Sequence, residues 1–150
     1  MRAMEMLAWE IAETAHALRR AYDRRAAELG VTRAQWRVLA WLSHAPDLRQ
    51  VDLADKLDVE AITLCRMIDR LEEAGLVERQ RDPEDRRAWR LRLTPKAAPV
   101  VEGLRRLATE LAETAFAGLG ESGTEEMRAS LKRIRANLCA TMTNPKQVSA

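Results

Sequence analysis

The spacing of apolar residues changes once along this chain, and that change constrains the fold more than any other feature. Over most of the sequence, apolar residues recur every three or four positions, as on one face of an α-helix. In residues 76–93, by contrast, Trp89, Leu91 and Leu93 alternate with arginines, which is the period of a β-strand. The pattern predicts a mainly α chain of α+β class whose strands form a two-stranded β-hairpin.

Long amphipathic helices are predicted towards both ends of the chain. A first helix over residues 4–29 ends at Gly30, a second over residues 101–119 is broken by the sequence GLGESG, and a last helix opens at Thr124. The apolar stripes of such helices must be covered by something. We therefore expect the terminal helices to pack intertwined in a two-fold dimer.

The middle of the chain has the pattern of a helix-turn-helix. Thr32 and Gln35 form a capping box that opens the helix preceding the helix-turn-helix. The sequences LRQVDLADKLDV and VEAITLCRMIDRLEEAG then predict two short helices with a very tight connection, and Gly75 ends the second. The residues expected to face the core are Trp36, Leu39 and Leu42 in the first of the three helices, Val51, Ala54 and Leu57 in the next, and Leu64, Met67, Ile68 and Leu71 in the last.

The last of these helices presents a face that suits the major groove of DNA. With Leu64 directed to the core and about 100° of rotation per residue, Ile62 and Arg66 point outward and Arg70 lies close to them. A guanidinium can donate two parallel hydrogen bonds to guanine O6 and N7, and an apolar side chain can contact a thymine methyl group. We expect Arg66 and Ile62 to meet base edges and Thr63 to bind a phosphate. Arg70 is either a DNA contact or a solvated surface charge.

The predicted hairpin is dense in arginine. Residues 86–92 hold four arginines and no acid, although residues 59–92 as a whole hold eight basic and eight acidic residues. A slim ribbon can lay its tip along the minor groove, where the negative potential of narrow A·T tracts attracts arginine. Asp85 is expected to hold a neighbouring guanidinium in an extended pose, and Arg90 and Arg92 are expected to form one basic face of the strand.

Composition and motifs argue against several other classes of protein. The formal net charge is only +2, so any signal for a nucleic acid must be local. Cys65 and Cys139 belong to no CxxC pair, His16 and His44 cannot build a histidine-rich metal site, and no glycine-rich phosphate loop or nucleophile elbow is present. We expect no disulfide, metal, cofactor or enzymatic activity, no signal peptide or membrane span, and a cytoplasmic location.

Residues 53–97, LADKLDVEAITLCRMIDRLEEAGLVERQRDPEDRRAWRLRLTPKA, resemble the winged helix-turn-helix of the MarR/SlyA transcription regulators. The blocks DRLEEAGLVER and DPEDRR match family motifs, and VTRAQWRVLAWL is similar to the family's second helix. The resemblance implies a homodimeric repressor on double-stranded DNA that leaves a roughly palindromic operator when a small aromatic or phenolic ligand binds. By position it places Ile62 and Arg66 in the major groove, and Arg87 or alternatively Arg86 in the minor groove.

The resemblance also implies that different segments of the chain have different functions. Residues 1–30 and 95–142 are the expected dimerisation helices, residues 31–94 the DNA-binding lobe, and residues 143–150 a flexible tail. The alternative to a ligand-responsive repressor is a DNA-binding architectural or dimerisation module that has no effector.

Ligand pockets of this family lie between the dimer helices and the DNA-binding lobe, a region that here offers His16, Arg19 and Trp36. A cation beside an indole suits an aromatic carboxylate, although Trp36 can instead be a core residue and His16 an interface residue. Cys65 is either a packed side chain or a thiol whose oxidation would disturb DNA contact. Glu60 departs from the family, which frequently has a helix-capping serine there. The early cysteine of its peroxide sensors and the clustered ligands of its zinc-responsive members are missing.

Overall fold

The computed structural model describes residues 2–143, and the chain divides after Leu111 into two compact units. The first unit holds helices α1 to α4, the β-sheet and most of α5, and it contains every residue of the predicted DNA-binding and ligand-binding sites. The boundaries predicted after residues 30, 94 and 142 separate segments by expected function, not by compactness, so this division does not test them and they stay predictions.

Helix α1 (Ala3–Glu28) and helix α2 (Arg33–His44) are joined by a short turn. Gly30 in this turn has a φ of +72°, a conformation that glycine adopts without strain. The predicted capping box opens α2. The Gln35 N–H donates to Thr32 Oγ1 over 3.2 Å, and the Thr32 N–H donates to Gln35 Oε1 over 3.0 Å.

Helices α3 (Gln50–Leu57) and α4 (Ala61–Glu73) form the predicted helix-turn-helix. Asp58 between them adopts a left-handed conformation with a φ of +53°, which makes the connection tight. The prediction for α3 is wrong at one position, because Val51 is 65% exposed and Leu53 is fully buried. In a helix of about two turns the apolar stripe can be drawn through either residue, and only packing distinguishes them.

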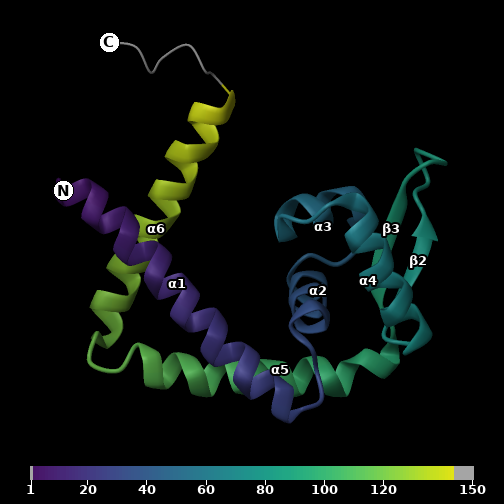
Figure 1. Cartoon of the computed structure of the whole chain (residues 1–150), viewed down its shortest axis with the longest axis horizontal. Helices are drawn as coiled ribbons and strands as arrows, with labels where there is room; N and C mark the ends of the chain where they lie inside the picture. Colours follow the sequence, from purple (N-terminus) through teal and green to yellow (C-terminus); the bar gives the residue numbers. More distant parts are fainter. Residues whose placement is uncertain (1, 144–150) are drawn as a thin grey trace. The chain divides into compact units, whose positions relative to one another are not determined.

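Strands β2 (Val77–Arg81) and β3 (Trp89–Leu93) pair antiparallel and form the predicted hairpin, which we call the wing. A third strand, β1 (Leu48–Arg49), pairs with the other edge of β3, so the sheet has the order β1-β3-β2 rather than two strands. Figure 1 shows the turn of the wing projecting past α3 and α4. A strand of two residues is too short to show an alternating period in the sequence.

The chain leaves the sheet through a 3₁₀ turn at Pro95–Ala97 and continues as α5 (Ala98–Ala115). Pro95 occupies the first helical position, where its missing N–H costs little. Thr94 precedes it, but its side chain does not cap the helix. The Thr94 hydroxyl instead donates to the Gly75 carbonyl over 2.5 Å, which joins the end of β3 to the turn after α4.

The second unit contains α6 (Gly120–Thr143), which begins before the predicted start at Thr124. Helix α5 also ends earlier than predicted, because the chain turns between Ala115 and Gly120, with a φ of +90° at Gly118 and +68° at Gly120. Of the predicted tail, residue 143 ends α6, and residues 144–150 lie outside the described part.

The core of the first unit lies beneath α4 and is almost entirely aliphatic. Each fully buried side chain of this size contributes about 1.5–3 kcal/mol to folding. The outward face of α4 therefore rests on a rigid apolar base. The largest fully buried side chains are Val38, Leu39, Leu42, Leu53, Leu57, Leu64, Ile68, Leu71 and Leu91.

Candidate nucleic-acid interface

The outward face of α4 carries the first group of predicted contact residues. Ile62 is 61% exposed, and Thr63, Arg66 and Arg70 are exposed beside it. Arg66 and Arg70 form no ion pair with any residue of the described range 2–143. Glu60 occupies the N-cap position of α4 without making a side-chain cap hydrogen bond. An exposed isoleucine beside unpaired guanidiniums is a surface that can contact base edges and phosphates.

The inner edge of α4 is held by Arg79, which lies on β2. Its guanidinium pairs with Asp69 over 2.8 Å and with Glu72 over 2.5 Å, and it also donates to the Cys65 carbonyl over 3.1 Å. Its Nε–H donates to Gln50 of α3 over 3.0 Å. Burial by itself would lower the pKa of Arg79, but the two acids raise it above its ordinary value. One mostly buried cation thus ties α4 to the wing and to α3.

Asp82 is buried at the turn of the wing, and its side chain is 0% exposed. Oδ1 accepts the N–H groups of Glu84 over 2.8 Å and Asp85 over 3.2 Å. Oδ2 accepts the Nε–H groups of Arg49 over 2.9 Å and Arg90 over 2.8 Å. These partners, with the Glu84 N–H first, lower the pKa of Asp82 to about 2 although burial opposes them. One carboxylate therefore caps the turn and links β1 with β3.

Asp47 neutralises the face of β3 that was predicted to be basic. Arg92 Nε donates to one carboxylate oxygen over 2.9 Å, and Arg90 Nη1 lies 3.3 Å from the other. The hydrogen bond from Arg92 is the main reason that the pKa of Asp47 is lowered. Arg90 and Arg92 lie on one face of the strand, as predicted, but an acid from the segment before β1 pairs with both of them.

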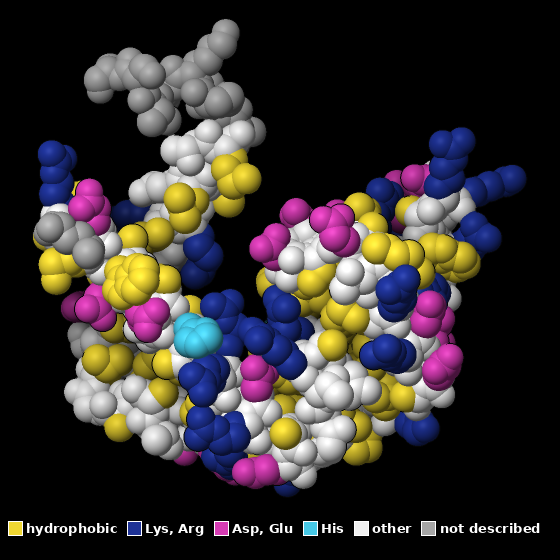
Figure 2. Space-filling model, viewed as in Figure 1, with side chains coloured by type: hydrophobic (Ala, Val, Ile, Leu, Met, Phe, Trp, Pro, Cys, Tyr) yellow, Lys and Arg dark blue, Asp and Glu magenta, His cyan; other side chains and the backbone are white. Residues whose placement is uncertain are grey.

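The tip of the wing keeps its positive charge. Arg86 and Arg87 are exposed and pair with no acid within residues 2–143 (Figure 2 shows basic side chains projecting at this end of the wing). Among the described residues Asp85 forms no ion pair with a guanidinium; its Oδ1 accepts the backbone N–H of Arg87 over 2.9 Å. Arg81 stacks 4.4 Å from the centre of the Trp89 ring and donates to the Arg86 carbonyl over 2.6 Å. The turn is thus shaped by its own polar groups.

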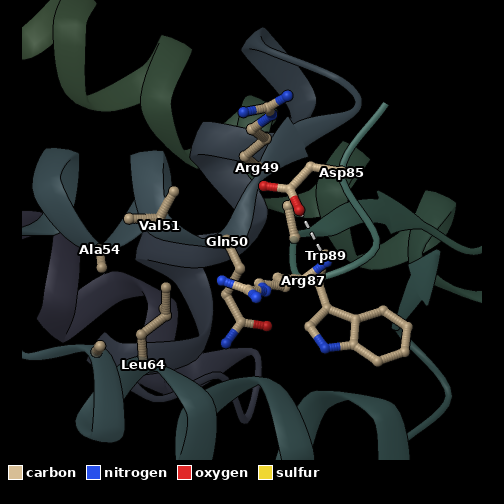
Figure 3. Close-up of a pocket in the computed structure, with 10 residues that line it drawn as sticks. Arg49, Gln50, Val51, Ala54, Leu64, Asp85, Arg87 and Trp89 are labelled. Atoms are coloured by element: carbon tan, nitrogen blue, oxygen red, sulfur yellow. Dashed lines mark hydrogen bonds between the residues drawn. The ribbon is translucent and has the colours of Figure 1, made fainter. Parts of the chain in front are cut away.

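A cavity of about 310 Å³ lies between the wing and the two helices of the helix-turn-helix. Arg87 and Trp89 line it from the wing, and Val51, Ala54 and Leu64 line it from the helices. Figure 3 shows the Arg87 side chain reaching from the wing into this space. The Arg87 side chain therefore has open space beside it between the wing and the helices.

The residues predicted to bind an effector lie on α1 and α2. His16 and Arg19 are exposed, whereas the half-buried Trp36 ring packs on Tyr22 with ring centres 4.4 Å apart and donates its Nε1–H to Asp23 over 2.7 Å. Neither the cavity beside the wing nor a second one, of about 760 Å³ between α2, β3 and α5, is lined by the three predicted residues. Trp36 has structural partners of its own, and the ligand role of all three stays a prediction.

Sequence reasoning missed Asp82, Asp47 and Arg79. A local signal existed for Asp82, because an aspartate followed by proline often opens a tight turn and accepts its N–H groups. No local signal marks the other two residues, since their partners come from other elements. Within residues 2–143, no group of His, Cys, Asp and Glu is arranged to hold a metal ion. In the same range, no helix has the length and apolar character needed to span a bilayer.

Comparison with known proteins finds likenesses that extend over the helix-turn-helix, the wing and the flanking helices. A model of the MarR family matches residues 31–89. The chain is 38% identical to the transcriptional regulator PA3341, with a TM-score of 0.80 over 88% of this chain and 97% of that one. It is 26% identical to a MarR transcriptional regulator from Methanosarcina mazei Go1, with a TM-score of 0.79 over 91% and 98%. It is 28% identical to a mutant MarR from E. coli complexed with operator DNA, with a TM-score of 0.71 over 85% and 92%.

Proposed function

This chain belongs to the MarR family of transcriptional regulators, and we propose that it is a homodimeric repressor of a palindromic operator. A small aromatic or phenolic ligand releases it from the DNA, and it acts in the cytoplasm. One observation carries the proposal: a single lobe presents guanidiniums that pair with no acid of residues 2–143, both on the outward face of α4 and at the tip of the wing. Two basic surfaces of this kind suit two adjacent grooves of one duplex.

In the proposed complex α4 lies in the major groove and the wing lies along the minor groove. Arg66 donates to a guanine, Ile62 contacts a thymine methyl group and Thr63 binds a phosphate, with Arg70 beside them. Arg87 enters the minor groove, and Arg86 is the alternative. Asp85 acts on the protein side, since it accepts the backbone N–H of Arg87. The operator complex of the E. coli MarR mutant, a protein of similar fold, supports this choice of partner.

A second copy of this chain is the proposed cover for the apolar residues of the terminal helices. On α1, Met4 is 86% exposed and Trp9 is 64% exposed. Helix α6, taken by itself, exposes 58% of Leu138 and 86% of Met142. Burial of apolar surface stabilises by about 25 cal/mol per Å², which favours an assembly that removes these side chains from water. A two-fold dimer then sets its α4 helices about one turn of B-form DNA, roughly 34 Å, apart.

An anionic aromatic effector is proposed for the region around His16, Arg19 and Trp36. Burial lowers the pKa of Arg37 on α2, and the positive charges of Arg33 and Arg19 lower it further, although nearby aspartates oppose them. Cations gathered in this way favour the binding of an anion. The indole beside them supplies an aromatic surface, so an aromatic carboxylate or a phenolate is the proposed class of ligand.

Selection of bound fragments from random DNA, followed by ligand challenge, tests the proposal. We expect a palindrome with half-sites about 10 base pairs apart, bound by a particle that sediments as a dimer. At least one compound from a panel of aromatic carboxylates and phenols should release the DNA. Arg19→Ala should weaken that response, whereas Arg20→Ala, which changes the neighbouring exposed arginine, should leave it intact.

Two other outcomes would contradict parts of the proposal. Stable binding to the palindrome that no compound relieves would identify an effector-independent architectural module. A pool without any enriched sequence would reject operator binding itself.

A further inference from the structure

We propose that Asp82 is a positioning residue for DNA binding, which sets where the tip of the wing presents Arg87. The inference rests on the proposed function, since it concerns the same interface. It adds a residue whose buried side chain acts through the protein rather than by touching DNA.

The first argument is the number of segments that Asp82 joins. Its carboxylate accepts hydrogen bonds from Arg49, the residue before α3, and from Arg90 on the far strand of the wing. It also accepts the N–H groups of Glu84 and Asp85 in the turn. One group thus fixes the turn both to the wing and to the start of α3. These bonds are one of the connections between the wing and the helix-turn-helix.

The second argument is a chain of hydrogen bonds that ends at Arg87. Asp82 Oδ1 accepts the Asp85 N–H over 3.2 Å, and Asp85 Oδ1 accepts the Arg87 N–H over 2.9 Å. The backbone position from which the Arg87 side chain extends is therefore set by two successive carboxylates. The turn has further bonds within the wing, such as the one from Arg81 to the Arg86 carbonyl, but the Asp82 carboxylate also joins the turn to the segment before α3.

The sign of the effect separates positioning from simple electrostatics. An acid near a polyanion repels it, so deleting a carboxylate from the wing by itself strengthens DNA binding. A positioning role predicts the opposite, because the contact of Arg87 with DNA is lost. Glu84 offers a matched control: it lies two residues away, its side chain is exposed, and Glu84→Gln removes the same charge without removing the carboxylate of Asp82.

The test measures operator affinity against salt for Asp82→Ala, Asp82→Asn, Glu84→Gln and Arg87→Ala. Asp82→Ala should weaken binding roughly tenfold and make the salt dependence shallower, since fewer counterions are released. Asp82→Asn keeps an oxygen for the turn but loses the charged pairs, so it should lie between wild type and Ala. Glu84→Gln should bind as tightly as wild type or slightly more tightly. In an Arg87→Ala background, Asp82→Ala should change affinity by less than about twofold.

The inference is overturned if the fold-losses in operator affinity of Asp82→Ala and Arg87→Ala multiply in the double variant. It is also overturned if Asp82→Ala and Glu84→Gln bind the operator equally well. If Arg87→Ala itself binds like wild type, the proposed role of the wing in DNA binding fails, which is a separate result. Circular dichroism and binding at a temperature well below the melting point exclude unfolding. If Asp82→Ala does not fold, the near-isosteric Asp82→Asn takes its place and is measured both alone and combined with Arg87→Ala. If Asp82→Asn weakens operator binding as much in the Arg87→Ala background as it does alone, the inference is overturned.

Discussion

Two sets of arginines on the DNA-binding lobe have opposite surroundings. The framework arginines are paired with acids inside the lobe, whereas the contact arginines form no ion pair within residues 2–143. The framework arginines are Arg49, Arg79, Arg90 and Arg92. The contact arginines, named for the role that we propose for them, are Arg66, Arg70, Arg86 and Arg87. The same residue type thus builds the lobe in one set and is left for a partner in the other.

The difference explains how a chain with a net charge of only +2 presents a basic surface. Acids lie where they neutralise the framework arginines, mainly as Asp47, Asp69, Glu72 and Asp82. A total charge therefore says little about this interface, because the distribution of acids decides which guanidiniums remain available. Mutation of a framework arginine should therefore lower the stability of the fold, whereas mutation of a contact arginine should lower the affinity for DNA.

The largest effect is expected at a contact arginine, Arg87. Arg87→Ala removes one groove contact from each wing of the proposed dimer, so operator affinity should fall by roughly a hundredfold if each contact contributes about 1–2 kcal/mol. The loss should be greatest for operators with A·T-rich flanks. Fluorescence anisotropy measures the affinity, and the melting temperature should stay at the wild-type value. Arg86→Ala is the control; a larger loss there would exchange the roles of the two residues.

The next effect is expected at a framework arginine, Arg79. Arg79→Leu leaves Glu72 and Asp69 without their cation, and the free energy of unfolding should fall by about 2 kcal/mol. For a chain of this length that corresponds to a decrease in Tm of roughly 5 °C. Arg70→Leu, a change of the same size at an exposed position of α4, should leave Tm within a degree or so. Equal melting of the two variants would contradict the division into two sets.

A smaller and more local effect is expected at Arg66. Arg66→Ala should reduce discrimination at one base pair of each half-site by about tenfold and leave the other positions as they were. Thr63→Ala should instead weaken all sequences alike, since a phosphate contact carries no sequence information. Binding to a set of single-base operator variants measures both. A uniform loss for Arg66→Ala would mean that this guanidinium contacts the backbone.

The smallest effect is an acid dependence that comes from Asp82. Its pKa is lowered from 3.8 to about 2 in the folded chain, so its carboxylate stabilises the fold above about pH 4. That contribution is lost as the pH falls towards 2, because the folded state must then bind the proton. The difference in Tm between wild type and Asp82→Asn should stay constant above pH 4 and shrink below it. A difference that stays constant down to pH 2 would show that the carboxylate's charge does not stabilise the fold.

Most secondary structure followed from local pattern. The capping box of Thr32 and Gln35, the helix-turn-helix and the alternation of Trp89, Leu91 and Leu93 each depend on neighbours a few residues apart, and the structure contains all three elements. The sequence predicted the ends of helices less accurately, since the turn between α5 and α6 begins earlier than the run GLGESG suggests. Any of several glycines can adopt a positive φ, so composition marks such a turn without placing its first residue.

The electrostatics of the interface followed from tertiary structure. Asp47 lies 45 residues before Arg92, and Asp82 lies 33 residues after Arg49, so no helical or strand period relates them. They meet because β1 pairs with β3 in one register, and that register depends on the packing of the whole lobe. The residues of α4 available to face DNA could therefore be read from spacing along the chain. Which arginines keep their charge for a partner depended on acids that only the folded chain brings within reach.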